Sequence, residues 1–328
     1  MSLIRNPLTI LLAVAAVGTL AVGCGGSDSE STTTAAGETT TTSAEPVDIT
    51  FVLPSLQDEG RIRQKAGAEQ KAGELKEVDL EVDAGATLNG APEEMVSILE
   101  NALIKEPDAI IVNAGAAPDQ ITPILQQAID DGVKVVSIDV ELPELEGQAT
   151  FVSLDDNQAS ATGGEWLSEL NPNGGEIGIV SCIVNHPVTK ARTEGFEAGL
   201  AANIKVGALV DAKCDVEKAR TMTENMLTTN PDLLAIYATT DDMALGALKA
   251  VEAVGKDIPV IGHDGNHAAM ESIEAGGLAA TVRNPFEEYG STAVEAAVDA
   301  VAGQRLPEGT LLNSTLITKN NVSRYIEH

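Results

Sequence analysis

Polar side chains gather in the segments that follow the expected β-strands of this chain. Asp139 and Asp264 each come shortly after an apolar run, and Thr240–Asp242 follows another. Such groups donate or accept several hydrogen bonds, so they suit recognition of a hydroxylated or charged small molecule. Paired carboxylates are also the catalytic groups of glycosidases, and His263 and His267 beside Asp264 are metal-ligand types.

Structural roles compete with binding at several of these positions. Asp215 and Asp241 open expected helices, where a carboxylate caps the first turn. Asn113 precedes Ala114-Gly115 and also fits a turn. No nucleophile-elbow motif, phosphate loop or Ser-His-Asp arrangement appears in the sequence, which argues against catalysis.

Strands and helices alternate along the body of the chain, and the series runs twice. The alternation restarts after the Pro- and Gly-containing segment 171–175, which marks a domain boundary or only a turn. This pattern predicts βαβ units with a parallel sheet covered on both faces, and ligands bound beyond the carboxyl ends of the strands. The strands are expected at 49–53, 80–83, 109–113, 133–138, 150–153, 176–181, 205–210, 234–238 and 258–262.

The N-terminus has the layout of an export signal, residues 1–23. Arg5 precedes an apolar run from Leu8 to Val22, too short and wrongly flanked for a permanent membrane span. The Leu20–Gly23 segment before Cys24 resembles a bacterial lipobox, in which the thiol is acylated. The alternative is an ordinary signal peptide with an incidental cysteine. Residues 25–46 are almost entirely small or polar, which predicts a flexible linker, so 24–46 would comprise the cysteine that the resemblance marks as lipidated and its linker.

Charge and cysteine content narrow the partners further. The chain has 50 acidic and 20 basic residues, a net charge of −30. Such a surface repels the phosphates of nucleic acid, so no nucleic-acid partner is expected. With Cys24 assigned to the anchor, Cys182 and Cys214 remain as an even pair in an exported protein.

Several motifs give the chain a resemblance to a known family. They are TTDDMALGAL at 239–248, IPVIGHDG at 258–265, LAATV at 278–282 and ARTEGF at 191–196. Over essentially all of 47–320 the chain resembles the ribose- and galactose-type periplasmic binding proteins, the solute receptors of ABC importers. Regulators of the lactose-repressor type share this body. They begin with a helix-turn-helix, however, where this chain has a lipobox and linker.

The resemblance implies an α/β fold of two doubly wound, Rossmann-like lobes joined by three hinge strands. The first lobe would comprise 47–154 plus 286–312, and the second 157–283 plus 316–328. Asp139 and Asp264, one per lobe, would accept hydrogen bonds from solute hydroxyls. The family's ligand contacts fall on Asp58, Arg61, Asp139, Lys190, Thr240, Asp264 and Asn284.

The chain departs from the family at the positions of its stacking rings. In the first lobe, Gly60 and Arg61 stand where the family has two aromatic residues, and Val140 stands where it often has an arginine. In the second lobe, Cys214 stands where the family has an aromatic ring. Sugars present apolar C–H faces that favour stacking, so a pocket without rings suits a small, strongly polar solute. Three other aromatic residues are expected in the core or on helix faces: Phe286, Trp166 and Tyr237.

The resemblance also brings the two remaining cysteines together. Cys182 would end the first strand of the second lobe, and Cys214 would lie just past the neighbouring strand. We therefore expect a Cys182–Cys214 disulfide that holds the Cys214 loop where a stacking ring usually lies.

The sequence thus predicts a monomeric solute-binding lipoprotein, anchored through Cys24 to the outer face of the cytoplasmic membrane. It would capture a sugar or polyol by hinge closure and deliver it to ABC permease subunits. No catalytic residue, cofactor or metal is expected. The alternatives are a sugar acid or other small anionic metabolite as solute, a metal-binding receptor with His186 beside His263 and His267, and a sensor for a membrane signalling partner.

Overall fold

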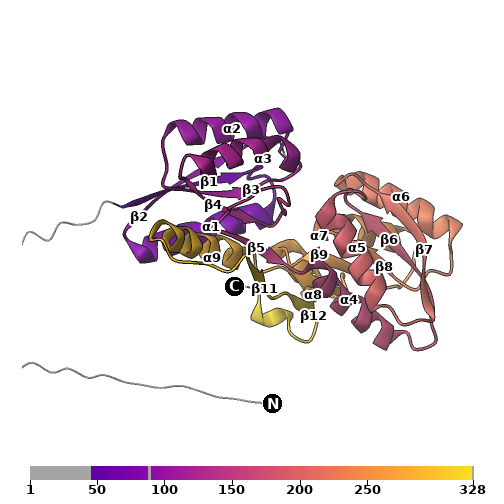
Figure 1. Ribbon diagram of the computed structural model, residues 1–328. Helices are drawn as coiled ribbons and strands as arrows, with labels where there is room; N and C mark the ends of the chain where they lie inside the picture. Colours follow the sequence, from indigo (N-terminus) through magenta and orange to yellow (C-terminus); the bar gives the residue numbers. More distant parts are fainter. Residues whose placement is uncertain (1–45, 88–89, 327–328) are drawn as a thin grey trace, which may run out of the picture. The chain divides into compact units, whose positions relative to one another are not determined.

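The computed structural model describes residues 46–87 and 90–326 (Figure 1). The expected signal peptide, the lipidation site Cys24 and the linker up to residue 45 lie outside these residues. Within the two described ranges, no helix is both long enough and apolar enough to span a bilayer.

The first lobe is built on a six-stranded sheet with the order β11-β5-β4-β3-β1-β2, and every neighbouring pair is parallel. Its helices are α1 (Glu59–Leu75), α2 (Pro92–Ile104), α3 (Pro118–Asp130) and α9 (Phe286–Val301). Its strands are β1 (Val47–Leu53), β2 (Val78–Ala84), β3 (Ala109–Asn113), β4 (Lys134–Ile138), β5 (Thr150–Leu154) and β11 (Gly309–Leu312).

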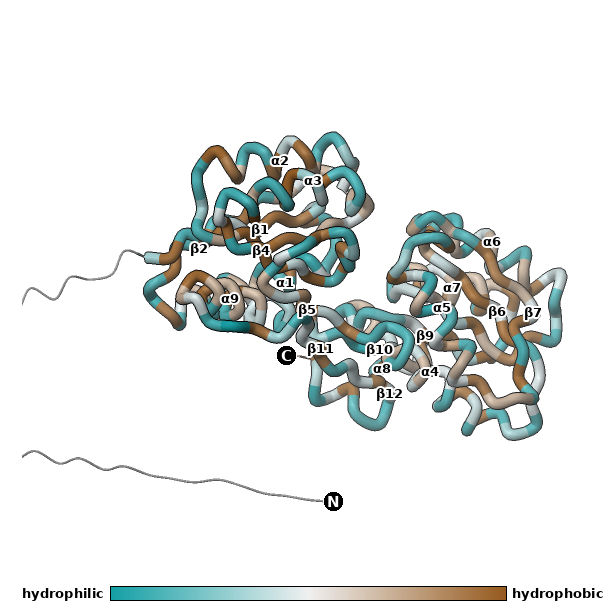
Figure 2. The backbone as a smooth tube through the Cα atoms, in the orientation of Figure 1, coloured by the Kyte–Doolittle hydropathy of each residue, from teal (hydrophilic) through white to brown (hydrophobic). Residues whose placement is uncertain are grey.

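Helices cover both faces of this first sheet because its central strands are mostly apolar and are buried on both faces. Successive side chains of a strand point to opposite faces. Phe51 accordingly packs in the core under α1 and α9, whereas Val52 packs in the core under α2 and α3. Figure 2 shows hydrophobic colour concentrated in the strands and polar colour on the outer turns of the helices.

The second lobe repeats the architecture on a sheet with the order β12-β10-β9-β8-β6-β7. Only its edge strand β12 is antiparallel, to β10. Its helices are α4 (Asp156–Leu170), α5 (Pro187–Gly199), α6 (Val216–Thr229), α7 (Asp241–Ala253) and α8 (His267–Ala275), with a 3₁₀ turn at Val322–Arg324. Its strands are β6 (Gly175–Ser181), β7 (Ile204–Asp211), β8 (Ile236–Ala238), β9 (Val260–Asp264), β10 (Ala280–Arg283) and β12 (Thr315–Thr318).

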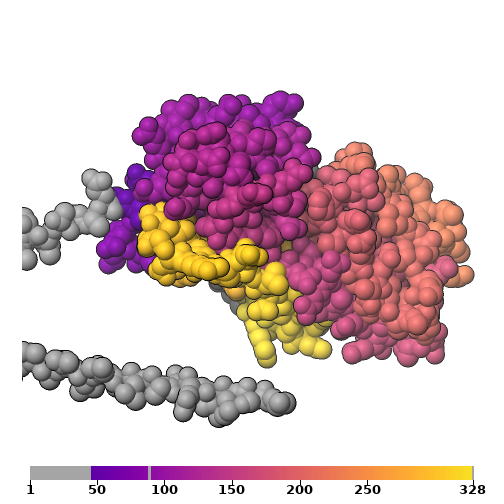
Figure 3. Space-filling model, in the orientation of Figure 1, coloured from indigo at the N-terminus to yellow at the C-terminus, as the bar shows by residue number. Residues whose placement is uncertain are grey.

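The chain passes between the two sheets three times: between β5 and α4, between β10 and α9, and between β11 and β12. The second passage returns α9 to the first lobe, where it packs along α1. The fit is close, since a Cβ on Gly290 would lie 1.9 Å from the backbone oxygen of Gln64. Figure 3 shows the late residues, in gold, against the purple surface of the first lobe.

The expected strand at 258–262 is shifted by two residues in the structure. β9 runs from Val260 to Asp264, so Asp264 ends the strand rather than lying in the loop beyond it. The expected strand at 234–238 is also shorter, since β8 begins at Ile236. Both differences fall at strand ends, where tertiary hydrogen bonds rather than residue type decide the boundary.

Candidate solute-binding site

A cleft lies at the carboxyl ends of the strands and is lined from both lobes. The position follows from the fold, because the loops after parallel strands meet at that edge of each sheet. The charged residues that line it are Asp58, Arg61, Asp139, Arg192, Asp242 and Asp264.

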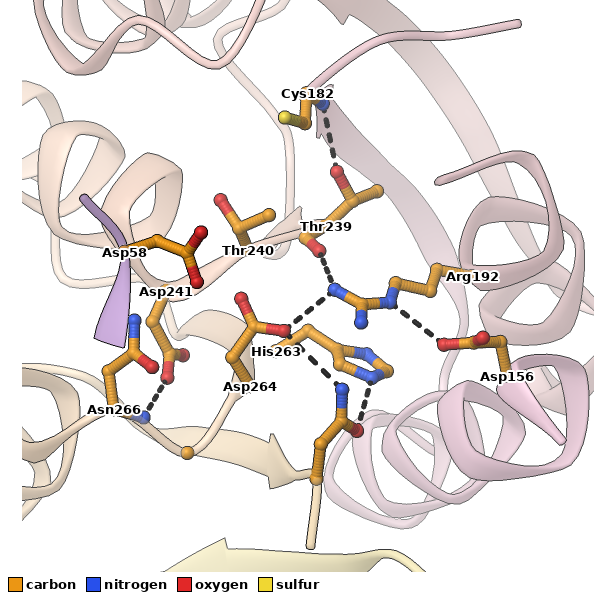
Figure 4. Close-up of polar contacts among 12 residues, drawn as sticks. Asp58, Asp156, Cys182, Arg192, Thr239, Thr240, Asp241, His263, Asp264 and Asn266 are labelled. Carbon is orange, nitrogen blue, oxygen red and sulfur yellow. Dashed lines mark hydrogen bonds and ion pairs between the residues drawn. The ribbon is translucent and has the colours of Figure 1, made fainter. Parts of the chain in front are cut away.

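Arg192 of α5 is the centre of the second lobe's half of the cleft (Figure 4). Its Nε donates to Asp156 at 2.9 Å, and its Nη1 donates to Asp264 at 2.8 Å and to the backbone oxygen of Thr239 at 3.0 Å. The residue is only 6% exposed. A planar guanidinium fixed by three acceptors is held in one orientation toward the cleft.

The charges of this network are unevenly balanced, because one guanidinium serves two carboxylates. Burial raises the pKa of Asp264 to about 7, against the lowering effect of Arg192, and burial also raises the pKa of Asp156. For Arg192, burial alone would lower the pKa, but Asp264 and Asp156 raise it, so the guanidinium stays charged. Burial therefore favours the protonated form of these two carboxyl groups more than one guanidinium offsets.

The backbone and a buried histidine hold Asp264 from behind. Asp264 has φ of 113°, a value unusual for a residue other than glycine, and its carbonyl accepts from the Asn284 N–H at 3.1 Å. His263 Nε2 lies 3.1 Å from Asn284 Oδ1, and its Nδ1 lies 3.2 Å from the Tyr237 hydroxyl. Burial, then Arg192, holds the pKa of His263 well below its usual value, so the ring is neutral and donates through Nε2.

The interpretation of Asp241 as a helix cap is wrong. Thr240 caps α7, accepting from the Met243 N–H at 3.4 Å. Asp241 is fully buried and accepts from the Thr281 hydroxyl at 2.6 Å and from the Asn266 N–H at 2.7 Å. Burial, then Asp264, raises the pKa of Asp241 well above its usual value. Asp215, by contrast, caps α6 as expected.

The first lobe contributes Asp58 and Arg61 from the start of α1. Asp58 caps the helix through the Arg61 N–H at 2.9 Å, and the Arg61 guanidinium returns to the same carboxylate at 2.5 Å. Gly60 between them is 2.8 Å, measured from a Cβ placed on it, from the ring of Phe286. Phe286 has the expected core role and also lines the cleft.

Asp139 follows β4 in a left-handed backbone conformation, with φ of 66°. Its Oδ2 accepts from Asn113 Nδ2 at 3.0 Å, and the same amide lies 3.3 Å from Gln64 Oε1. Asn113 Oδ1 also accepts from the Gly115 N–H at 3.1 Å, so Asn113 has both the turn role and a role in positioning Asp139. Asp139 forms no ion pair with any described residue.

Cys182 and Cys214 are joined by a disulfide that lines the cleft. Lys213 and Cys214 both have left-handed backbones, with φ of 57° and 56°. The Cys214 N–H donates to the Cys182 carbonyl at 3.0 Å, and the Cys182 N–H donates to the Thr239 hydroxyl at 2.9 Å. The bridge thus ties the loop after β7 to the network around Arg192.

Residues 49–305 match the family described as "Periplasmic binding protein domain". The chain belongs to this family. It is therefore a solute-binding protein and not an enzyme, which removes the glycosidase interpretation of Asp139 and Asp264. In this binding protein the two carboxylates lie on opposite sides of a solute cleft.

Named relatives of this binding protein come from several bacteria. The D-ribose/D-allose-binding protein of Pseudomonas aeruginosa is 28% identical over 264 residues, covering 78% of this chain and 82% of the relative. A solute binding protein of Actinobacillus succinogenes solved with bound D-allose has a TM-score of 0.79 and 27% identity, covering 86% of this chain and all of that one. A Bacillus halodurans solute binding protein with bound myo-inositol has a TM-score of 0.78 and 26% identity, covering 87% of this chain and 99% of that one.

Two residues expected to contact the solute lie elsewhere in this binding protein. Lys190 is not among the described residues that line the cleft; its side chain is 62% exposed, with its ammonium 3.7 Å from Glu194. Asn284 is also absent from that lining, is 1% exposed, and positions Asp264 and His263 instead. The buried cation is Arg192, which the 191–196 motif contained but which sequence reasoning did not select.

The histidines of this binding protein do not converge. His263 is fully buried away from the cleft, His267 is paired with Glu271 at 3.3 Å, and His186 lies 3.5 Å from the Gly115 carbonyl. Burial lowers the pKa of His186, which keeps it neutral. Across the described residues, no group of three or more His, Cys, Asp or Glu side chains is arranged to hold a metal ion.

Polar contacts cross from one lobe of this binding protein to the other. The Arg63 guanidinium donates to the Gly265 carbonyl at 3.1 Å, and the His267 N–H donates to the Glu59 carboxylate at 2.9 Å. These contacts join helix α1 to the β9–α8 segment beside the cleft.

Proposed function

We propose that this protein is the receptor of an ABC importer for a sugar or polyol, which it captures by closing the two lobes. The observation that carries the proposal is the cleft itself, lined from both lobes by carboxylates and guanidiniums in a periplasmic binding protein fold. Relatives that bind ribose, allose or myo-inositol support the same class of solute.

The arrangement suits a molecule with several hydroxyl groups. Asp58 and Asp139 on one lobe, with Asp264 on the other, offer carboxylate oxygens that accept hydroxyl hydrogen bonds. Arg61 and Arg192 offer N–H donors to solute oxygens. A solute that bonds to both halves binds the closed form better than the open one, so it shifts the population toward closure.

The site set that we propose follows from this geometry. Asp58, Arg61, Asp139, Thr240 and Asp264 contact the solute, and Arg192 takes the role expected of Lys190. Asn284 acts through Asp264. We also propose lobes of 47–154 plus 286–312 and of 157–283 plus 316–328, which membership of β11 and β12 in different sheets supports.

An anionic solute is the weaker alternative. Both cleft arginines already serve carboxylates, Arg61 with Asp58 and Arg192 with Asp156 and Asp264. A solute carboxylate would have to compete with these partners. A sensor role toward a membrane signalling partner would use the same capture step.

Thermal shift measurements with a library of sugars, polyols, sugar acids and amino acids test the solute class. A sugar or polyol should raise the melting temperature, and isothermal calorimetry of that hit should give its Kd. Asp264→Ala should weaken binding by about 2–5 kcal/mol, because it removes one buried partner of Arg192 and leaves the solute hydroxyls without theirs. A library in which only sugar acids bind, or an unchanged Kd in the variant, would contradict the proposal.

The membrane anchor is a separate part of the proposal and has its own test. We propose acylation of Cys24 after cleavage of residues 1–23, on the extracytoplasmic face, with a monomeric body that meets the permease. A Cys24→Ser variant should leave the membrane fraction while keeping its solute affinity. Retention of the variant in membranes would refute the anchor and leave solute binding untouched.

A further inference from the structure

The cleft has more negative than positive charge. Among the described residues that line it are the four carboxylates Asp58, Asp139, Asp242 and Asp264 and the two guanidiniums Arg61 and Arg192. His186 adds no charge, because burial lowers its pKa. Asp139 and Asp242 form no ion pair with any described residue, one in each lobe. A solute without charge would leave Asp139 and Asp242 without a cation.

The surplus is concentrated where Asp242 and Asp264 face Asp58. Burial and then Asp58 raise the pKa of Asp242, and the charges of Asp58 and Asp242 add to the burial that raises the pKa of Asp264. These three carboxylates come from both lobes and act on one another across the cleft. Asp242 and Asp264 therefore cost free energy to ionise until a cation enters.

A buried amide oxygen in the same corner has no partner. Asn266 lines the cleft, is 9% exposed, and its Oδ1 makes no hydrogen bond within the described structure. Its backbone N–H is bound to Asp241, beside Asp264 (Figure 4). An amide oxygen and ionised carboxylates only accept hydrogen bonds. This group of acceptors therefore suits a ligand group with several donors.

On the first lobe, a buried hydrogen-bond donor has no partner among the described residues. Gln64 also lines the cleft and is fully buried, and its Nε2 makes no hydrogen bond within the described structure. This donor lies beside Asn113, which holds Asp139. The cleft therefore offers an unused donor at Gln64 and a region of unused acceptors around Asn266.

We propose that the natural solute is a hydroxylated ring or chain that carries a protonated amine, of the amino-sugar or aminocyclitol class. The ammonium group lies among Asp242, Asp264 and the Asn266 oxygen, and donates to them. A hydroxyl or ring oxygen accepts from Gln64, and further hydroxyls donate to Asp139. This inference rests on the proposed function, since it names the solute of the same cleft.

Matched solutes that differ only at one position test the inference. Calorimetry on the purified protein at neutral pH would compare D-glucose with D-glucosamine, D-galactose with D-galactosamine, and myo-inositol with an amino-deoxy-inositol. N-acetyl-D-glucosamine keeps the nitrogen without the charge. We expect the amine to bind at least about tenfold more tightly than its parent in at least one pair, and acetylation to remove the gain.

Variants locate the amine. Asp242→Asn should reduce the amine-to-parent preference to less than about threefold, since it removes one of the charges while keeping the side-chain shape. Asp232→Asn, an exposed carboxylate away from the cleft, is the matched control and should keep the full preference. Equal preference in both variants would refute the placement of the ammonium group.

The outcomes separate this inference from the proposed function. If neutral sugars or polyols bind as tightly as their amines in every pair, the amine inference is wrong and the sugar or polyol receptor stands. If neither neutral nor amino solutes bind, the proposed function itself is wrong.

Discussion

The two halves of the cleft are built in different ways. In the second lobe, Arg192 and its partners Asp156 and Asp264 have side chains 8%, 11% and 15% exposed, and a disulfide ties a neighbouring loop to them. In the first lobe, Arg61 and Asp58 form a local pair at a helix start, with side chains 16% and 31% exposed. The second half is fixed by buried charges before the solute arrives. The first half combines this pair with Asp139, which is held by the buried amide of Asn113.

This difference matters because burial changes how much an ion pair contributes to the free energy of unfolding. A pair near the surface is worth little, since water replaces its partners at low cost. Removing one member of a buried network leaves uncompensated charge in a medium that cannot solvate it. The same residue type, arginine, should therefore have unequal importance in the two lobes.

Replacing each arginine by methionine should give the largest contrast. We expect Arg192→Met to lower the free energy of unfolding by about 3–5 kcal/mol, because two buried carboxylates lose their cation. Arg61→Met, the matched control, should cost less than about 1 kcal/mol. Urea unfolding followed by circular dichroism measures both. Equal losses would mean that the two halves do not differ as described.

The disulfide should stabilise the second lobe by a somewhat smaller amount. Its cysteines are separated by 32 residues in sequence. Closing a loop of that length in the unfolded chain is worth about 3.7 kcal/mol. A reductant should therefore lower the melting temperature of the wild type but not that of a Cys182→Ala, Cys214→Ala double variant. A wild type insensitive to full reduction, checked by intact mass, would rule out this bracing role.

The buried acids of the second lobe should make the empty protein more stable at mildly acidic pH. The folded-state pKa of Asp264 is raised to about 7, chiefly by burial, so its stabilising contribution is complete at low pH and is lost as the pH rises through 7. Between about pH 5 and pH 8 this loss is on the order of 2 kcal/mol. The unfolding free energy of Asp264→Asn should fall less over that range. Parallel pH curves for wild type and variant would contradict it.

The smallest effect on affinity and stability is expected at Lys190, which was predicted to contact the solute but lies outside the cleft lining. Lys190→Ala should change the solute Kd and the unfolding free energy by less than about 0.5 kcal/mol, because its side chain is 62% exposed. Calorimetry and urea unfolding check both quantities against the wild type. A tenfold loss of affinity would restore Lys190 to the solute contacts.

The fold was accessible from the sequence because its signals are local and repeated. Buried parallel strands read as apolar runs, and the segment from Ala109 to Asn113 became β3 without a shift. Asp139, Thr240 and Asp264 were placed in the cleft because strand ends converge at one edge of a sheet. That rule needs only the order of the elements.

The hydrogen-bond and ion-pair partners of the cleft residues could not be predicted from the order of the elements. Residues two apart on α5, Lys190 and Arg192, differ in orientation by about half a turn, so one reaches the buried acids and the other reaches solvent. Asp241 looked like a cap because caps are the usual role of an aspartate at a helix start. Its actual partner, Thr281, is 40 residues away and has no sequence signal.

The return of α9 to the first lobe also bears on how the chain acquires its structure. Helix α1 packs along α9, whose Gly290 fits against the Gln64 backbone, although more than two hundred residues separate them in the sequence. A polypeptide made from its N-terminus therefore leaves one side of the first sheet only partly covered, by α1, until nearly all of it has been synthesised. The second lobe also waits for the end of the chain, since Ile317, Val322 and Ile326 are buried in its core. Neither half of this receptor can therefore complete its hydrophobic interior until the last residues have been made.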